Sequence, residues 1–115
     1  MKEKIKKFFS MLLIELSDLE ENMNMLIETT EERFKNHEIT GYVWTENTAL
    51  LKRERYLLQL IRRHVIEELS PGDFSSIEEA KKAVLQIVEK QDSVPKAVPE
   101  FIDRRLEKVL RYLEE

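Results

Sequence analysis

Apolar residues recur through the first third of the chain in alternating steps of four and three. The positions are Ile5, Phe9, Leu12, Leu16, Leu19, Met23 and Leu26. This spacing keeps one apolar stripe on one side of a helix and is the heptad form of the amphipathic pattern. It predicts one long helix over residues 4–36, ended by Asn36 and His37, because Asn tolerates the left-handed conformation at a helix end.

A second apolar run of the same kind covers residues 50–69 and follows a short segment that contains Gly41. We expect Thr45 to cap the start of this helix and Ser70-Pro71-Gly72 to end it. If the chain reverses near residue 40, residues whose numbers sum to about 80 face each other. Met23 then faces Leu57, apolar against apolar. The two runs therefore predict a long antiparallel helical hairpin.

The last third of the chain carries the signals of two shorter helices. Ser76 followed three residues later by Glu79 is a capping box, so a third helix begins there and reaches about Gln91. The sequence Asp92-Ser93-Val94-Pro95 ends it, and Pro99 fits the first turn of a fourth helix, where its missing N–H costs nothing. The inner face of that helix carries Phe101, Ile102, Leu106, Val109, Leu110 and Leu113.

The chain therefore predicts an all-α, four-helix-bundle-like fold within a single domain, residues 1–115. Residues 1–69 form the long helical hairpin and residues 76–114 a shorter C-terminal helical hairpin. Residues 8–16 are apolar on nearly every side, so we expect the short hairpin to pack at that end. The opposite end, residues 30–51, then projects with two helices and needs a second copy or a protein partner to cover it.

Composition removes several classes of chemistry. Charged residues make up 37% of the chain and there are only two glycines, which favours helices and disfavours a phosphate-binding loop. The absence of cysteine excludes disulfides, thiolate catalysis and Cys-based metal sites. A net charge of −4 argues against a surface that binds nucleic acid as a whole. No apolar run approaches the roughly 18 residues of a membrane span. We therefore expect a cytoplasmic protein that does not bind membranes.

Glu54 is the most unusual position, because it lies on the apolar stripe of the second helix between Leu50 and Leu57. Thr30 and Asn47 also fall on inward positions near this level. The three polar residues predict a polar core layer that fixes the register of the helices. The alternative is a ligand site in which a Glu54 carboxyl of raised pKa acts on a bound molecule. We favour the structural interpretation, since perturbed carboxyl groups also arise in ion-pair networks.

Tyr42, Val43 and Trp44 precede the second helix and place two aromatic rings at the tip of the hairpin. Exposed aromatic side chains on a loop are favoured anchors for a protein partner, so these residues are the candidate partner-binding site. In an equally weighted alternative, Trp44 closes the hairpin as a hydrophobic staple.

Two charged clusters are candidate binding sites. Lys52, Arg53, Arg55, Arg62 and Arg63 form a basic cluster on the second helix. Such a cluster can bind phosphates, but Glu54 interrupts it and the first helix is rich in nearby acids, so we expect charge pairing within or between chains. Glu28, Glu31 and Glu32 fit a solvated face better than a metal site, because no histidine follows a Glu in the Glu-x-x-His spacing.

No catalytic, metal or nucleotide motif stands out, and we expect neither a cofactor nor a metal. The leading hypothesis is a small non-enzymatic helical adaptor or regulatory protein, a homodimer that binds a protein partner through the projecting hairpin. One alternative is a small helical enzyme or ligand-binding bundle with a polar site around Glu54. The other is a nucleic-acid-associated regulator that uses the basic face of the second helix.

Overall fold

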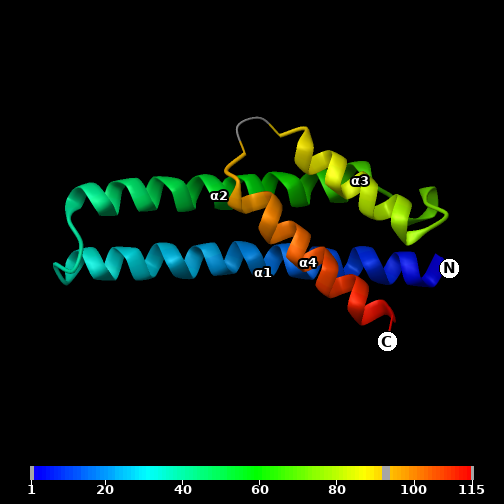
Figure 1. The fold of residues 1–115 in the computed structure, drawn as a ribbon, viewed down its shortest axis with the longest axis horizontal. Coiled ribbons are helices and arrows are strands. Elements are labelled where there is room, and N and C mark those ends of the chain that lie inside the picture. Colours follow the sequence, from blue (N-terminus) through cyan, green and yellow to red (C-terminus); the bar gives the residue numbers. More distant parts are fainter. Residues whose placement is uncertain (1, 92–93, 115) are drawn as a thin grey trace.

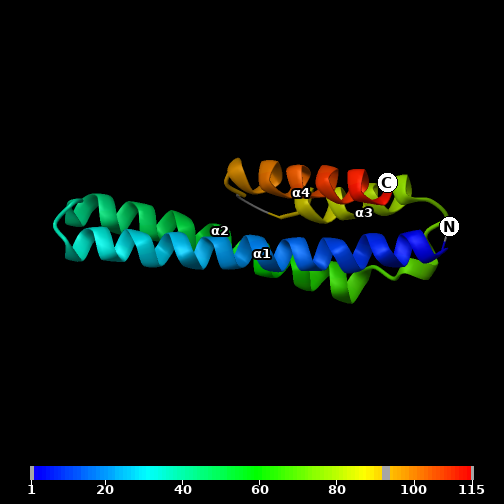
Figure 2. The same cartoon turned by 90° about the horizontal axis from the view of Figure 1, so that it is seen from below.

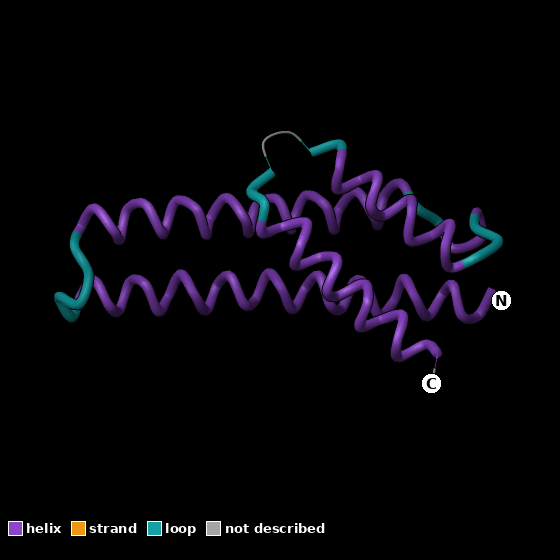
Figure 3. Tube along the Cα trace, in the orientation of Figure 1, coloured by secondary structure: helices purple, strands orange, loops and turns teal. Residues whose placement is uncertain are grey.

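The computed structural model describes residues 2–91 and 94–114, and this part of the chain contains four α-helices and one short 3-10 helix. The helices are α1 (Lys2–Lys35), α2 (Gly41–Glu68), α3 (Ile77–Glu89) and α4 (Ala97–Glu114), with the 3-10 turn η1 (Pro71–Asp73) after α2. Short loops join them (Figure 3). The prediction of an all-α, bundle-like fold is confirmed. The division into one domain with two hairpins stays a prediction.

The helices form two layers over only half of the molecule. α1 and α2 lie side by side and antiparallel along the longest dimension of 54 Å (Figure 1). α3 and α4 lie on one face of this pair, over the half that contains the N-terminus, and leave the other half one layer thick (Figure 2). We call the two-layer half proximal and the one-layer half distal.

The hydrophobic core follows this division. Buried residues of α1 run from Ile5 to Met23, and those of α2 run from Glu54 to Val65. From α3 and α4 the core receives Ala80, Val84, Ile87, Val88, Val98, Ile102, Leu106, Val109 and Leu113. The periodic stripes of α1 and α2 continue into the distal half, but α3 and α4 do not cover them there.

α1 ends in a hydrogen-bonded reversal centred on His37. The N–H of Glu38 donates to the carbonyl of Arg33 at 2.9 Å, and the N–H of His37 donates to the carbonyl of Phe34 at 3.1 Å. This pair of bonds is the Schellman arrangement, which needs a left-handed residue just past the helix. His37 supplies it with a φ of 60°, although Asn36 was the residue expected to do so.

The expected start of the second helix is wrong by one turn. Thr40, not Thr45, is the N-cap, and its Oγ1 accepts a hydrogen bond from the N–H of Val43 at 3.2 Å. The Thr45 hydroxyl instead donates to the Gly41 carbonyl at 2.8 Å, inside the helix. Both threonines are competent caps in isolation; the tight reversal at His37 brings the chain into position to start α2 at Gly41.

The caps of the shorter helices agree with the sequence. Ser76 Oγ accepts from the N–H of Glu79 at 3.2 Å, and the Glu79 carboxylate accepts from the N–H of Ser75 at 3.1 Å. That backbone hydrogen bond lowers the pKa of Glu79. Pro99 lies in the first turn of α4, as predicted. α3 ends at Glu89, and of the expected helix break Asp92 and Ser93 lie outside the described residues.

Candidate protein-interaction surface

The distal half exposes apolar side chains where the proximal half buries them. Leu26 continues the α1 stripe beyond Met23 and is 47% exposed, and Leu50 continues the α2 stripe beyond Glu54 and is 49% exposed. Val43, two turns further along the same stripe, is 37% exposed. We define the open distal face as Leu26, Thr30, Val43, Asn47 and Leu50. It is the continuation of the surface that α3 and α4 cover in the proximal half.

The aromatic tip closes the end of the hairpin. The rings of Phe34 and Trp44 stack with centroids 4.6 Å apart and an interplanar angle of 10°. Trp44 is half-buried by this contact, while Tyr42 is 75% exposed. Tyr42, Val43 and Trp44 lie in the first turn of α2 and not on a loop as expected. The stack gives Trp44 a part in closing the hairpin and leaves Tyr42 and Val43 as the accessible side chains.

Glu54 marks the boundary between the two halves. It is 5% exposed, and burial raises the pKa of its carboxyl group. Within residues 2–91 and 94–114 this carboxyl group makes no hydrogen bond or ion pair. Its oxygens keep some contact with solvent, but a carboxylate that loses part of its hydration without gaining a partner is unfavourable.

The other two members of the expected polar site do not join Glu54. The Thr30 hydroxyl donates to the Leu26 carbonyl of its own helix at 2.8 Å. Asn47 is exposed and lies seven residues from Glu54, or about 10 Å along α2 at the usual rise. The buried hydroxyl nearest in sequence to Asn47 is that of Thr48, which has no hydrogen-bond partner within the described residues. These placements give no converging set of polar groups for a ligand.

The basic cluster of α2 is partly used to hold the hairpin together. Arg62 donates to the buried Glu20 of α1 from two nitrogens, at 2.5 and 3.3 Å, and Arg55 donates to Asn24 at 2.8 Å. These partners, like Phe34 and Trp44, have residue numbers that sum to about 80. Lys52 and Arg63 remain exposed on the surface. Two of the five cations therefore serve the packing of α1 on α2.

A second ionic cluster, which the sequence did not reveal, joins α4 to α1. Arg105 donates to Glu15 at 2.5 Å and to Asp18 at 2.7 Å, and Lys108 Nζ lies 2.8 Å from Glu15. Burial alone raises the pKa of Glu15, but hydrogen bonds from Lys108 and Arg105 outweigh it and lower that pKa. A surface hollow lined by Met11, Glu15, Lys108, Arg111 and Tyr112 adjoins this cluster. Helix periodicity places Glu15 and Asp18 on one edge of α1, but it does not say which helix reaches them.

The described residues were found to contain neither a metal-ligand cluster nor a membrane-spanning helix. Residues 2–91 and 94–114 hold no group of three His, Asp or Glu side chains placed to bind a metal ion. No helix among these residues is both long enough and apolar enough to cross a membrane. Comparison with models of known protein families, with curated proteins and with solved structures found no match.

Proposed function

We propose that this chain is a small non-enzymatic helical adaptor or regulatory protein of the cytoplasm, which acts as a homodimer through protein–protein interaction. The observation that carries the proposal is the open distal face. Leu26, Leu50 and Val43 continue the core stripes and are 47%, 49% and 37% exposed. Exposed apolar side chains that continue a core stripe are characteristic of interaction sites.

The shape of the open distal face favours a helical partner segment. In the proximal half the equivalent surface of α1 and α2 is covered by helices, α3 and α4 (Figure 2). The distal half exposes the continuation of the same two stripes, so an amphipathic helix can lay its apolar side along them. Val43, 37% exposed at the end of this face, would contact the end of such a helix.

Co-purification from cells tests this site directly. We expect a tagged wild-type protein to retain a stoichiometric protein partner after nuclease treatment, and a Leu26→Ser/Leu50→Ser variant to lose it. Tyr56→Ser is the matched control, because Tyr56 is 58% exposed but lies on the opposite side of α2 from Glu54. Equal partner recovery by all three proteins would refute the open distal face as the binding site.

The two alternative functions have less support. The enzyme hypothesis needs Thr30 and Asn47 beside Glu54, and neither reaches it. The nucleic-acid hypothesis needs the basic cluster of α2, in which Arg62 and Arg55 bind side chains of α1. The adaptor proposal needs only the apolar surface that the distal half exposes.

A further inference from the structure

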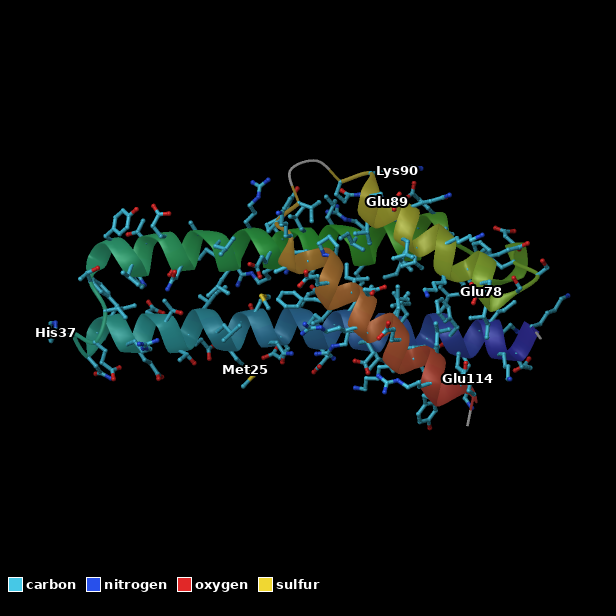
Figure 4. All side chains as sticks on the ribbon, viewed as in Figure 1. Met25, His37, Glu78, Glu89, Lys90 and Glu114 are labelled. Atoms are coloured by element: carbon cyan, nitrogen blue, oxygen red, sulfur yellow. The ribbon has the colours of Figure 1, made fainter. Side chains whose placement is uncertain are left out.

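α1 carries a second stripe of heptad spacing on its outer side. Steps of four and three connect Lys7, Met11, Ile14, Asp18, Glu21, Met25, Glu28 and Glu32, which we define as the outer stripe. Ile14 is 68% exposed and Met25 is 58% exposed. Figure 4 shows Met25 pointing away from α2. An apolar pair three turns apart on a solvent-facing stripe suits contact with another helix.

The outer side of α1 is also electrically divided along its length. Its first part carries Lys4 and Lys7 beside one acid, Glu3, and its last part carries Glu28 and Glu32 beside one base, Lys35, so the first part is net basic and the last part net acidic. α4 crosses α1 at the basic end, so that its C-terminus lies beyond the outer edge of α1 (Figure 1). There Lys108 and Arg111 of α4 line a hollow together with Met11 of the outer stripe. α4 therefore adds two positively charged side chains next to the basic end of the outer side of α1.

This charge pattern selects one orientation for a second copy. If two α1 helices lie antiparallel with Ile14 against the partner's Met25, Lys7 falls opposite the partner's Glu32 and Met11 falls opposite the partner's Glu28. The partner's Glu28 then also meets Lys108 and Arg111, which line the hollow beside Met11. A parallel pair would instead place Lys7 against its own copy and Glu32 against its own copy. Like charges would then be opposed at every charged position of the stripe, whereas the antiparallel pair opposes them only where Asp18 meets the partner's Glu21.

The centre of the antiparallel pair is acidic and is balanced by α4. Asp18 and Glu21 approach the two-fold axis from each copy. Asp18 is already bound by Arg105 at 2.7 Å, and the exposed Arg104 precedes Arg105 on the same helix. Each copy thus brings the guanidinium group of Arg105 to the region where the carboxylates meet.

We propose that two copies of this chain pair antiparallel along the outer stripe of α1, with Ile14 against Met25 and the acidic end of each α1 against the basic α1–α4 edge of the other. This proposal rests on the homodimer in the proposed function and specifies its interface. The pairing is isologous, so every contact occurs twice and the assembly closes as a dimer. It leaves the open distal face uncovered for a different partner.

Cysteine crosslinking tests the orientation, because the chain contains no cysteine of its own. An equimolar mixture of Ile14→Cys and Met25→Cys proteins should form a disulfide-linked heterodimer under mild oxidation, while each protein alone should not. In the antiparallel pair the two copies of position 14 lie about 16 Å apart along the helix axis, beyond disulfide reach. Crosslinking of Ile14→Cys with itself, or no crosslinking of the mixture, would overturn the proposal.

Sedimentation equilibrium tests the two kinds of contact. Met25→Glu should raise the dimer dissociation constant by at least about tenfold, while Tyr56→Glu, equally exposed at 58%, should leave it unchanged. Lys7→Glu should weaken the dimer, and Lys7→Glu/Glu32→Lys should restore it. A monomeric wild type, or failure of the double variant to recover, counts against the interface.

The two proposals can fail separately. Met25→Glu leaves the open distal face intact and should still recover the protein partner, whereas Leu26→Ser/Leu50→Ser should remain dimeric. Circular dichroism is the folding control: each variant should show the same helix content as the wild-type protein. A variant that loses the protein partner but remains dimeric assigns partner binding to the residues of the open distal face. A variant that loses the dimer but keeps the protein partner assigns dimerisation to the outer stripe.

Discussion

His37 and Glu54 are two residues at which the fold tolerates a local cost. His37 holds a φ of 60° at the end of α1, a conformation that favours glycine. Glu54 places a carboxyl group at a position that is only 5% exposed. The residues one turn before and one turn after it on the same side of α2 are apolar. Both costs act locally, so single substitutions can measure them.

Replacing His37 with glycine should stabilise the protein. Glycine adopts the left-handed conformation without the steric cost that a Cβ brings, and we expect His37→Gly to raise the free energy of unfolding by about 1 kcal/mol. Urea denaturation at constant m-value measures the change. Glu31→Gly, within the regular part of α1, should do the opposite by roughly 1 kcal/mol. A destabilised His37→Gly protein would contradict this account of the helix end.

Replacing Glu54 with leucine should also stabilise the protein, on the order of 1 kcal/mol at neutral pH, because an unpaired buried carboxylate is removed. The raised pKa of Glu54 fixes the sign of the pH dependence: its cost is absent below the unfolded pKa and grows as pH rises through the folded pKa. The advantage of Glu54→Leu should therefore be smaller at acidic pH. If Glu54→Leu is destabilised at pH 7, the carboxyl group has a binding role that the fold depends on.

At the scale of the elements, ionic contacts fix how the helices meet. Arg62 with Glu20 joins α2 to α1, and Arg105 with Glu15 and Asp18 joins α4 to α1. Both clusters contain a largely buried carboxylate, since Glu20 and Glu15 side chains are 10% and 14% exposed. Removing one partner of such a pair leaves a poorly hydrated charge, which costs more than losing a surface ion pair.

The Glu15 cluster should make α4 packing sensitive to acid. The pKa of Glu15 is lowered in the folded protein, so its contribution is present above the unfolded pKa of about 4.3 and is lost as pH falls through the folded value. Glu15→Gln should be less stable than wild type at pH 7, and the two proteins should converge toward pH 3. Thermal unfolding across this pH range measures the difference. A constant difference at all pH values would show that Glu15 acts through packing and not through its charge.

The helix-start prediction also belongs to this scale. Thr40 and Thr45 both fit an N-cap by residue type, and Thr45 is the residue predicted from the sequence. The structure starts α2 at Gly41 because the chain reverses within a few residues of Lys35. Tyr42, Val43 and Trp44 become helical as a result, and the Phe34–Trp44 stack forms across the reversal.

At the scale of the whole molecule, stability should be unevenly distributed. The proximal half has two layers of helices and the whole apolar core, while the distal half has α1 and α2 alone beyond Met23 and Glu54 (Figure 2). Segments with few buried contacts open more readily than the rest of a domain.

Hydrogen exchange should report this difference. Backbone amides of residues 26–52 should exchange faster than those of residues 5–19 and 57–66, because local opening of the distal half leaves the core intact. Mass spectrometry of the purified protein measures both segments in one experiment. Binding of a partner to the open distal face should slow exchange in residues 26–52 selectively. Uniform protection of the unbound protein would contradict a separately opening distal half.

The sequence by itself determined the elements of this protein. Heptad spacing predicted the two long helices, the capping box at Ser76 and Glu79 and the proline at position 99 predicted the two short ones, and the near absence of glycine agreed with both. Reversal near residue 40 predicted which levels of α1 and α2 face each other, as the Arg62–Glu20 and Arg55–Asn24 contacts show. These features are local or periodic, so neighbouring residues suffice to specify them.

The tertiary structure decided the rest, because each remaining feature depends on residues far apart in the chain. Arg105 and Glu15 are 90 positions apart, and no local pattern links them. Glu54 was expected inside and is buried, but Thr30 bonds to its own helix and Asn47 lies two turns away along α2, so neither meets it. No second layer of described helices covers the distal half. The same missing layer leaves Leu26 and Leu50 exposed. Periodicity can say which side of a helix is apolar, and only packing says whether anything covers it.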